Sequence, residues 1–364
     1  KALNMVEPEH RPRATEYIEQ MKEMVNDLLN KEMAYVTKDG IYFDVKKFKS
    51  YGKLSGNTIE NLCAGARVDV NDQKKCSADF ALWKFCTGTN ENHVLRWSSP
   101  GESNKEGFPG WHIECSAMSR SLLGDQIDIH TGGEDNIFPH HECEIAQSES
   151  VTGKDPFVSM WVHRRRIDMG AEKMSKSLGN VLNLDDICGM GYSPLDLRYL
   201  FLSVHYRTQL KFTEKGLSDA KKARRKIMEW MSIIDNAFPD DSSISHEMDE
   251  QIKMFKNAMD EDLNTPAALA DIFTVMNFYY ANPKIDQENL IQYKEFVKIV
   301  RNTFGCFKPE AEGKVPEEVE KLLRQREDAR ANKDFALSDS LRDEIKALGY
   351  EVRDSGEDQI LKHL

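Results

Sequence analysis

The sequence predicts an α/β fold followed by a largely helical second half, and three observations support this prediction. From Pro109 onward, short apolar runs such as 127–129 and 160–162 alternate with helix-like segments, as in an α/β layer. Beyond Pro194, nearly every segment has helical character. The length of 364 residues is two to three times that of an ordinary domain, so we expect two to four domains.

The first elements are an amphipathic helix and a strand pair. Apolar residues recur every three or four positions across 14–33, which predicts a helix. Asp39-Gly40 then separates two β-rich runs within 34–45, the composition that a tight hairpin turn requires. Residues 46–108 are rich in Gly, Ser, Asn and Lys, so we expect an irregular insertion with a small core of its own.

The later elements follow from the same patterns. A helix is expected from His140 to Gln147, between the two predicted strands. The sequence shows no internal repeat and no low-complexity tract. The second half is expected to be helical at 195–204, 216–234, 248–280 and 290–303, with a long charged helix or helix pair at 317–348 and a short strand at 349–353.

Composition and charge exclude some classes of protein. No uncharged run of 18 residues is present, which excludes a membrane-spanning helix. The net charge is −12, but residues 161–230 carry 14 Lys and Arg against 8 Asp and Glu, a local +6, so a basic face for a phosphate backbone is compatible with an acidic chain. Seven thinly spread cysteines indicate reduced thiols and a cytoplasmic location. The chain begins at Lys1 without an initiator Met or a secretion signal, so we interpret it as starting partway through a protein.

The densest group of candidate metal ligands combines Cys115 with the segment 138–144. If Pro139 opens a helix, His140 and Glu144 are four residues apart and project from one face. Thiolate, imidazole and carboxylate are all ligands that zinc accepts. The pairs His141 with Glu144 and His140 with Cys143 are equally compatible with this spacing.

Two further segments have a composition suited to phosphate and nucleotide binding. Lys173 and Lys176 are separated by small residues, and their ammonium groups could neutralise a polyphosphate leaving group. Gly132, Gly133 and Asp135 follow a predicted strand, where backbone can approach a ligand and a carboxylate can hold ribose hydroxyls. On composition alone, a solvated loop and a simple turn explain these segments as well.

Taken together, these segments resemble the cysteinyl-tRNA synthetases, a family of class I aminoacyl-tRNA synthetases. Lys173-Met-Ser-Lys-Ser177 is similar to the KMSKS signature of that class, and the resemblance covers essentially the whole chain in order. The other matching segments are 110–118, 130–135, 138–147, 11–15, 64–67, 205–210, 262–266 and 329–336.

The resemblance implies a role for each candidate residue. Cys115, His140 and Glu144 match three of four ligands of one zinc ion, which binds the thiol of the substrate cysteine. Trp111 and His130 match the amino-acid pocket. His130 to Asp135, with Gly132 and Gly133, match the wall beneath the ribose of ATP, which enters with Mg²⁺. Lys173 and Lys176 match the catalytic lysines, and Lys176 stabilises departing pyrophosphate.

The resemblance also implies a fold and its boundaries. The expected catalytic domain is Rossmann-like and incomplete here, because neither the family's fourth zinc-binding cysteine nor its His-Ile-Gly-His type motif occurs before Cys115. A chain lacking both is expected to be zinc-deficient or to bind zinc weakly, and to activate cysteine poorly. The expected parts are a catalytic segment (1–45), a connective insertion (46–108), the second half of the catalytic domain (109–170), the KMSKS loop and stem-contact region (171–240), a tRNA-binding helical bundle (241–312) and a small C-terminal anticodon-binding domain (313–364).

The implied function is cysteine–tRNA ligation. L-cysteine and ATP would give cysteinyl-adenylate, and the acyl group would pass to tRNA(Cys), with the protein acting as a monomer in the cytoplasm. Two alternatives remain: a cysteine ligase with an amino-sugar acceptor, and a non-catalytic fragment that binds tRNA or zinc. The candidate phosphate contacts are Lys321, Arg324, Arg326, Arg330 and Lys333, and also Lys221, Lys222, Arg224, Arg225 and Lys226; exposed helix charge explains both sets as well.

Overall fold

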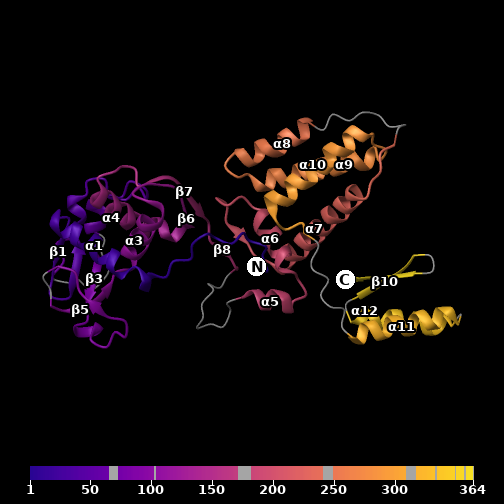
Figure 1. Ribbon diagram of the computed structural model, residues 1–364, viewed down its shortest axis with the longest axis horizontal. Coiled ribbons are helices and arrows are strands. Elements are labelled where there is room, and N and C mark those ends of the chain that lie inside the picture. Colours follow the sequence, from indigo (N-terminus) through magenta and orange to yellow (C-terminus); the bar gives the residue numbers. More distant parts are fainter. Residues whose placement is uncertain are drawn as a thin grey trace. The chain divides into compact units, whose positions relative to one another are not determined.

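A computed structural model gives the structure of the chain, which falls into two compact units, Lys1–Cys306 and Phe307–Leu364 (Figure 1). No helix in the described part of the chain is both long and apolar enough to cross a bilayer. The structure describes residues 1–64, 73–101, 104–170, 182–240, 249–308, 317–332, 334–348, 350–355 and 358–363.

The first elements confirm the predicted helix and hairpin. A short 3₁₀ turn, η1 (Ala14–Glu16), leads into helix α1 (Ile18–Asn30), which buries one apolar face. Strands β1 (Ala34–Val36) and β2 (Gly40–Phe43) pair antiparallel around Asp39-Gly40, as the turn composition predicts.

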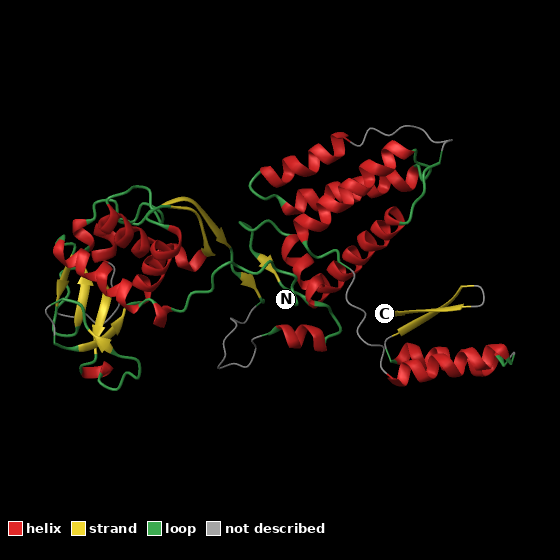
Figure 2. Ribbon diagram, viewed as in Figure 1, coloured by secondary structure: helices red, strands yellow, loops and turns green. Residues whose placement is uncertain are grey.

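A five-stranded antiparallel sheet in the order β1-β2-β3-β5-β4 includes strands from the segment expected to be irregular. Figure 2 shows helices beside this sheet. The buried residues of β3 lie in one hydrophobic cluster with those of α1, so this segment does not have the separate core that we expected. The added elements are η2 (Val45–Lys47), α2 (Ile59–Ala64), β3 (Phe80–Phe85), η3 (Gly88–Asn90), β4 (Trp97–Ser98) and β5 (Glu106–Pro109).

The α/β part follows β5. Strands β6 and β7 pair in parallel, which confirms the predicted α/β character and extends both strands beyond the short apolar runs. Ile129 and Met160 are more than half exposed on these strands. The elements are α3 (Trp111–Leu123), β6 (Ile127–Gly133), η4 (Glu134–Asn136), the π-helical turn η5 (Ile137–His141), α4 (Glu142–Thr152) and β7 (Val158–Arg164).

The helical second half agrees with the periodicity, with one difference. The segment 248–280, expected as one helix, contains two helices, α8 and α9, because Asp262 and Leu263 adopt positive φ values of 54° and 55°. Asn264 then caps α9 by accepting a hydrogen bond from the N–H of Ala267 at 3.3 Å. The elements are β8 (Ile167–Asp168), α5 (Leu184–Gly189), α6 (Pro194–Leu202), β9 (Leu210–Lys211), α7 (Glu214–Asp235), α8 (Asp249–Asp260), α9 (Thr265–Ala281) and α10 (Gln287–Phe304).

The second unit is a helix pair followed by a hairpin. Helices α11 (Glu317–Ala331) and α12 (Phe335–Ala347) precede the antiparallel strands β10 (Tyr350–Ser355) and β11 (Asp358–His363). Val319, Ile345 and Val352 form its buried core. Arg326, a predicted phosphate contact, is buried instead, and its guanidinium donates to Gln359 Oε1 at 2.8 Å. Lys333 lies outside the described residues.

The cysteines differ from expectation at one position. Cys76 is disulfide-bonded, which corrects the expectation that all thiols are reduced. Cys86, Cys115, Cys143, Cys188 and Cys306 are free, as predicted.

Candidate metal and substrate site

Helix α3 places Cys115 at the edge of the site. Gly110 precedes the helix and passes so close to β3 that a Cβ atom there would lie 2.0 Å from the carbonyl oxygen of Ala81. This contact fixes the start of α3, and Cys115 follows one turn later. Trp111, in the first turn, is 62% exposed, and its ring lies 4.7 Å from that of His140. The structure therefore brings the two predicted α3 residues beside the predicted histidine ligand.

His140 and Glu144 meet across the junction of η5 and α4. The predicted helix start at Pro139 is replaced by a π-helical turn, yet the four-residue spacing still brings His140 Nε2 to 3.0 Å from Glu144 Oε1. Glu144 Oε2 lies 3.4 Å from His130 Nε2 on β6. The Glu144 carboxylate is fully buried, and neither oxygen accepts a well-formed hydrogen bond from a described residue. A buried carboxylate in this state is suited to binding a cation.

Cys115, His140 and Glu144 fit a zinc ion by their donor chemistry. One sulfur, one nitrogen and one oxygen lie within 4.8 Å of one another, and zinc accepts all three types. Burial, reinforced by the neighbouring Glu144 carboxylate, raises the pKa of the Cys115 thiol to about 12. A bound cation would oppose this shift, because a coordinated thiol loses its proton.

A second group, His130, His141 and Glu144, shares the same carboxylate. His141 Nδ1 lies 2.8 Å from His163 Nε2, so its other ring nitrogen faces the group. Burial lowers the pKa of His141 to about 3, which keeps this imidazole neutral at physiological pH. The pairing of His141 with Glu144 thus remains geometrically possible. The pairing of His140 with Cys143 is not supported, because the buried Cys143 Sγ contacts the Tyr51 hydroxyl at 3.5 Å.

The predicted nucleotide segment lies at the carboxyl end of β6. Gly132 packs closely against the His141 ring, whereas Gly133 has open space and Asp135 is exposed. Glu134, between them, accepts a hydrogen bond from the backbone N–H of Arg166 at 2.9 Å and pairs with the Arg165 guanidinium at 3.2 Å. Lys173 and Lys176 lie outside the described residues.

Several neighbours of the site were not predicted. His112 Nδ1 lies 2.8 Å from His140 Nδ1, and burial lowers the pKa of His112 to about 4. Trp161 and His163 alternate on β7, with the Trp161 ring 4.8 Å from that of His130. The sequence could have indicated these neighbours, because residues two apart on a strand, such as Trp161 and His163, point to the same face.

Comparison with known proteins gives consistent family matches along the chain. Residues 1–222 match the family described as tRNA synthetases class I (C) catalytic domain. Residues 254–308 match the DALR domain, and residues 312–360 match the cysteinyl-tRNA ligase anticodon binding domain.

Curated relatives agree with these matches. A cysteine–tRNA ligase of Chlamydia felis is 40% identical over 362 residues, which cover 97% of this chain and 75% of that protein. The corresponding protein of Methanococcus maripaludis is 40% identical, covering 94% and 74%. That of Thermococcus onnurineus is 40% identical, covering 100% and 78%. With its α/β catalytic part, helical region and small terminal unit, the chain belongs to the cysteine–tRNA ligase family of class I aminoacyl-tRNA synthetases.

Proposed function

We propose that this protein activates L-cysteine with ATP and transfers the cysteinyl group to tRNA(Cys). The observation that carries the proposal is the convergence of one thiol, one imidazole and one buried carboxylate in a chain of this family. The cysteine carboxylate attacks the α-phosphorus of ATP, which breaks the bond to pyrophosphate and forms cysteinyl-adenylate. A ribose hydroxyl of the tRNA then attacks the acyl carbonyl, and AMP leaves.

Cys115, His140 and Glu144 would hold a zinc ion at this site. When bound, zinc supplies a centre that favours the soft thiolate of cysteine over the hard hydroxyl of serine. An apolar pocket alone separates such isosteres poorly, so this preference would supply most of the discrimination. The full burial of Glu144 and the presence of donors of three types support this assignment.

Trp111 and His130 would contact the substrate cysteine. The exposed indole of Trp111 lies beside the His140 ring, and His130 lies on the opposite side of Glu144. Burial lowers the pKa of His130, so its imidazole is neutral and can donate or accept one hydrogen bond. These positions suit residues that orient the amino acid next to the metal ligands.

Gly132, Gly133 and Asp135 would bind the ribose side of ATP, and Lys173 and Lys176 its phosphates together with Mg²⁺. The open space at Gly133 supports close approach of a ligand to this backbone. The lysines would stabilise the negative charge that develops as pyrophosphate leaves.

The acceptor in this proposal is a tRNA. The match of residues 312–360 to an anticodon binding domain favours tRNA over the amino-sugar acceptor, because a small acceptor needs no such domain. Several basic residues of α7 are paired within the protein, among them Arg224 with Asp196. Lys226 of α7 and the exposed Lys321 and Arg324 of α11 are therefore better phosphate contacts.

Substitution of Cys115 by serine tests the metal assignment. We expect Cys115→Ser to lower zinc content and to reduce the preference for cysteine over serine by at least about tenfold in cysteine-dependent pyrophosphate exchange, because the hard hydroxyl is a poorer zinc ligand than the thiolate. Cys188→Ser, at an exposed free thiol, is the matched control and should change neither quantity. Unchanged zinc content and selectivity in Cys115→Ser would contradict the assignment.

A further inference from the structure

We propose that Glu142 is a positioning residue for the metal ligands, an inference that rests on the proposed function. Its side chain attaches the loop 50–56 to the first turn of α4 and thereby sets the rotation of that helix about its axis. His140 and Glu144, which precede and follow Glu142, are carried by the same turns.

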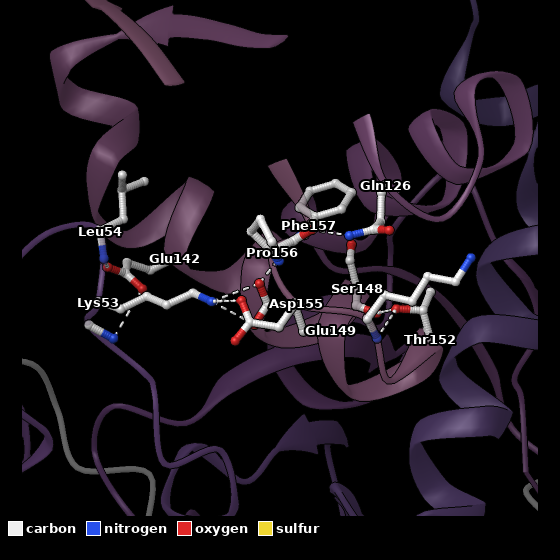
Figure 3. Close-up of polar contacts among 12 residues, drawn as sticks. Lys53, Leu54, Gln126, Glu142, Ser148, Glu149, Thr152, Asp155, Pro156 and Phe157 are labelled. Carbon is white, nitrogen blue, oxygen red and sulfur yellow. Dashed lines mark hydrogen bonds and ion pairs between the residues drawn. The ribbon is translucent and has the colours of Figure 1, made fainter. Parts of the chain in front are cut away.

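Within the described residues, the hydrogen bonds of Glu142 are all to backbone N–H groups. Its fully buried carboxylate accepts hydrogen bonds from the N–H of Gly52 at 3.0 Å, and from the N–H groups of Leu54 and Ser55 at 2.6 Å each. Figure 3 shows this carboxylate directed at the loop. The loop turns tightly there, since Gly52 has a φ of 95° and a Cβ atom on it would lie 1.8 Å from the carbonyl oxygen of Asn57. A charged acceptor satisfying three donors of a rigid turn is a strong attachment.

The same loop holds α4 further along its length. The Lys53 ammonium lies 2.8 Å from each carboxylate oxygen of Glu149 and 2.9 Å from Asp155 (Figure 3). The Tyr51 hydroxyl contacts Cys143 Sγ. The loop therefore follows one side of the helix over two turns.

The face of α4 that contacts the loop 50–56 lies opposite the face that carries the metal ligand Glu144. At 3.6 residues per turn, Glu142 and Glu149 share one face, whereas Glu144 points about 200° away from Glu142. The Glu144 carboxylate meets His130 and His140 on that opposite face. A small rotation of α4 would move the Glu144 oxygens away from Cys115, so the attachment on one face fixes the ligand geometry on the other.

Substitution of Glu142 by glutamine isolates this role. The amide oxygen of glutamine can still accept from Leu54 and Ser55, but its NH₂ group faces the N–H of Gly52, so two donors oppose each other. Glu149→Gln is the control: it makes the same change on the same face of α4 and weakens the contacts with Lys53 and with the N–H of Phe157, but it lies more than one turn beyond Glu144.

The experiment measures zinc affinity by chelator competition and the absorption spectrum of bound Co²⁺ for the full chain. Loss of an outer contact of a metal site costs about 10–100-fold in metal affinity, and we expect this loss in Glu142→Gln, together with an altered Co²⁺ spectrum. Glu149→Gln should lower the unfolding temperature but keep the wild-type zinc affinity and spectrum. If Glu142→Gln does not fold, Glu142→Asp, which keeps the charge but shortens the side chain, should fold and bind zinc more weakly than the wild type.

Three results would overturn the inference, and they are distinguishable. Wild-type zinc affinity and Co²⁺ spectrum in a folded Glu142 variant would remove the positioning role. An equal loss of affinity in Glu149→Gln would show that general helix stability matters instead. Equal affinity of the wild-type chain and Cys115→Ser for zinc and for Co²⁺ would contradict the proposed metal site itself.

Discussion

At the residue scale, Glu144 is the residue shared by both candidate ligand groups. Both ligand groups of the described chain use its carboxylate, which is fully buried and approached by the imidazoles of His130 and His140. Burying a carboxylate without hydrogen-bond donors is unfavourable unless a cation compensates. The buried Glu144 charge thus destabilises the metal-free protein, and metal binding would remove this destabilisation.

The neighbouring glycines Gly132 and Gly133 are expected to have different roles. Gly132 packs against the His141 ring, and Gly133 is open to a ligand. A Cβ atom on Gly132 would lie 2.6 Å from Cε1 of the buried His141 ring, whereas one on Gly133 meets nothing within 4 Å. We expect Gly132→Ala to lower the free energy of unfolding by about 1–3 kcal/mol through overpacking. Gly133→Ala should leave it nearly unchanged but raise the KM for ATP, because the added methyl group would occupy the open space where the nucleotide approaches the backbone. Denaturant unfolding and pyrophosphate exchange measure the two effects, and equal destabilisation by both variants would contradict this prediction.

At the element scale, a buried ion pair between α6 and α7 also contacts the segment that follows α10. The Arg224 guanidinium lies 2.8 Å from Asp196 Oδ1 and donates to the carbonyl oxygen of Cys306 at 2.7 Å, and both side chains of the pair are buried. Asp196 belongs to α6 and Arg224 to α7, and Cys306 lies just after the end of α10.

Loss of Arg224 should strongly destabilise these helices. Arg224→Met would leave the Asp196 carboxylate buried without its charge partner, which costs about 3–5 kcal/mol of unfolding free energy. Arg225→Met is the control on the same helix, since its exposed pair with Glu229 is worth about 0–1 kcal/mol. Denaturant unfolding followed by circular dichroism measures both, and similar midpoints for the two variants would contradict the prediction.

At the scale of the whole first unit, contacts of Asp262 connect the α8–α9 turn to 205–208. Its carboxylate accepts from the Arg207 guanidinium and from the Tyr206 hydroxyl, each at 2.5 Å. The Arg164 guanidinium donates to the carbonyl oxygens of Tyr206 and Thr208. Arg164 thus contacts backbone carbonyls, and its neighbours Arg165 and Arg166 contact Glu134.

The Asp262 contact should make stability depend on pH. The hydrogen bond from Arg207, followed by that from Tyr206, lowers the pKa of Asp262. A depressed pKa stabilises the folded state above the unfolded-state pKa of about 3.9, and this stabilisation is lost as the pH falls through the lower folded-state value. We expect Asp262→Asn to reduce the fall in thermal unfolding midpoint between neutral pH and about pH 3. An identical fall in variant and wild type would contradict this prediction.

Local rules predicted the elements well where the residues themselves set the conformation. Asp39-Gly40 specified the hairpin, and apolar periodicity specified α1, α7 and α10. The break between α8 and α9 was missed because periodicity continues across it, although Asn264 and Pro266 are a helix-start signal. The strands at 80–109 were missed because the pairings that form them, β3 with β2 and β5 with β3, are non-local.

By itself, the sequence determined the family, the helical periodicity and a short list of candidate ligands, since these depend on residue type and spacing. Only the tertiary structure decided that Cys143 faces Tyr51 and that Glu142 holds a distant loop. It also brought together Cys115, His140 and Glu144, the set that the resemblance implies and that spacing alone left open. The physical reason is that ligand geometry depends on how α3, α4 and β6 pack together, and packing brings together residues whose separation along the chain carries no periodic signal.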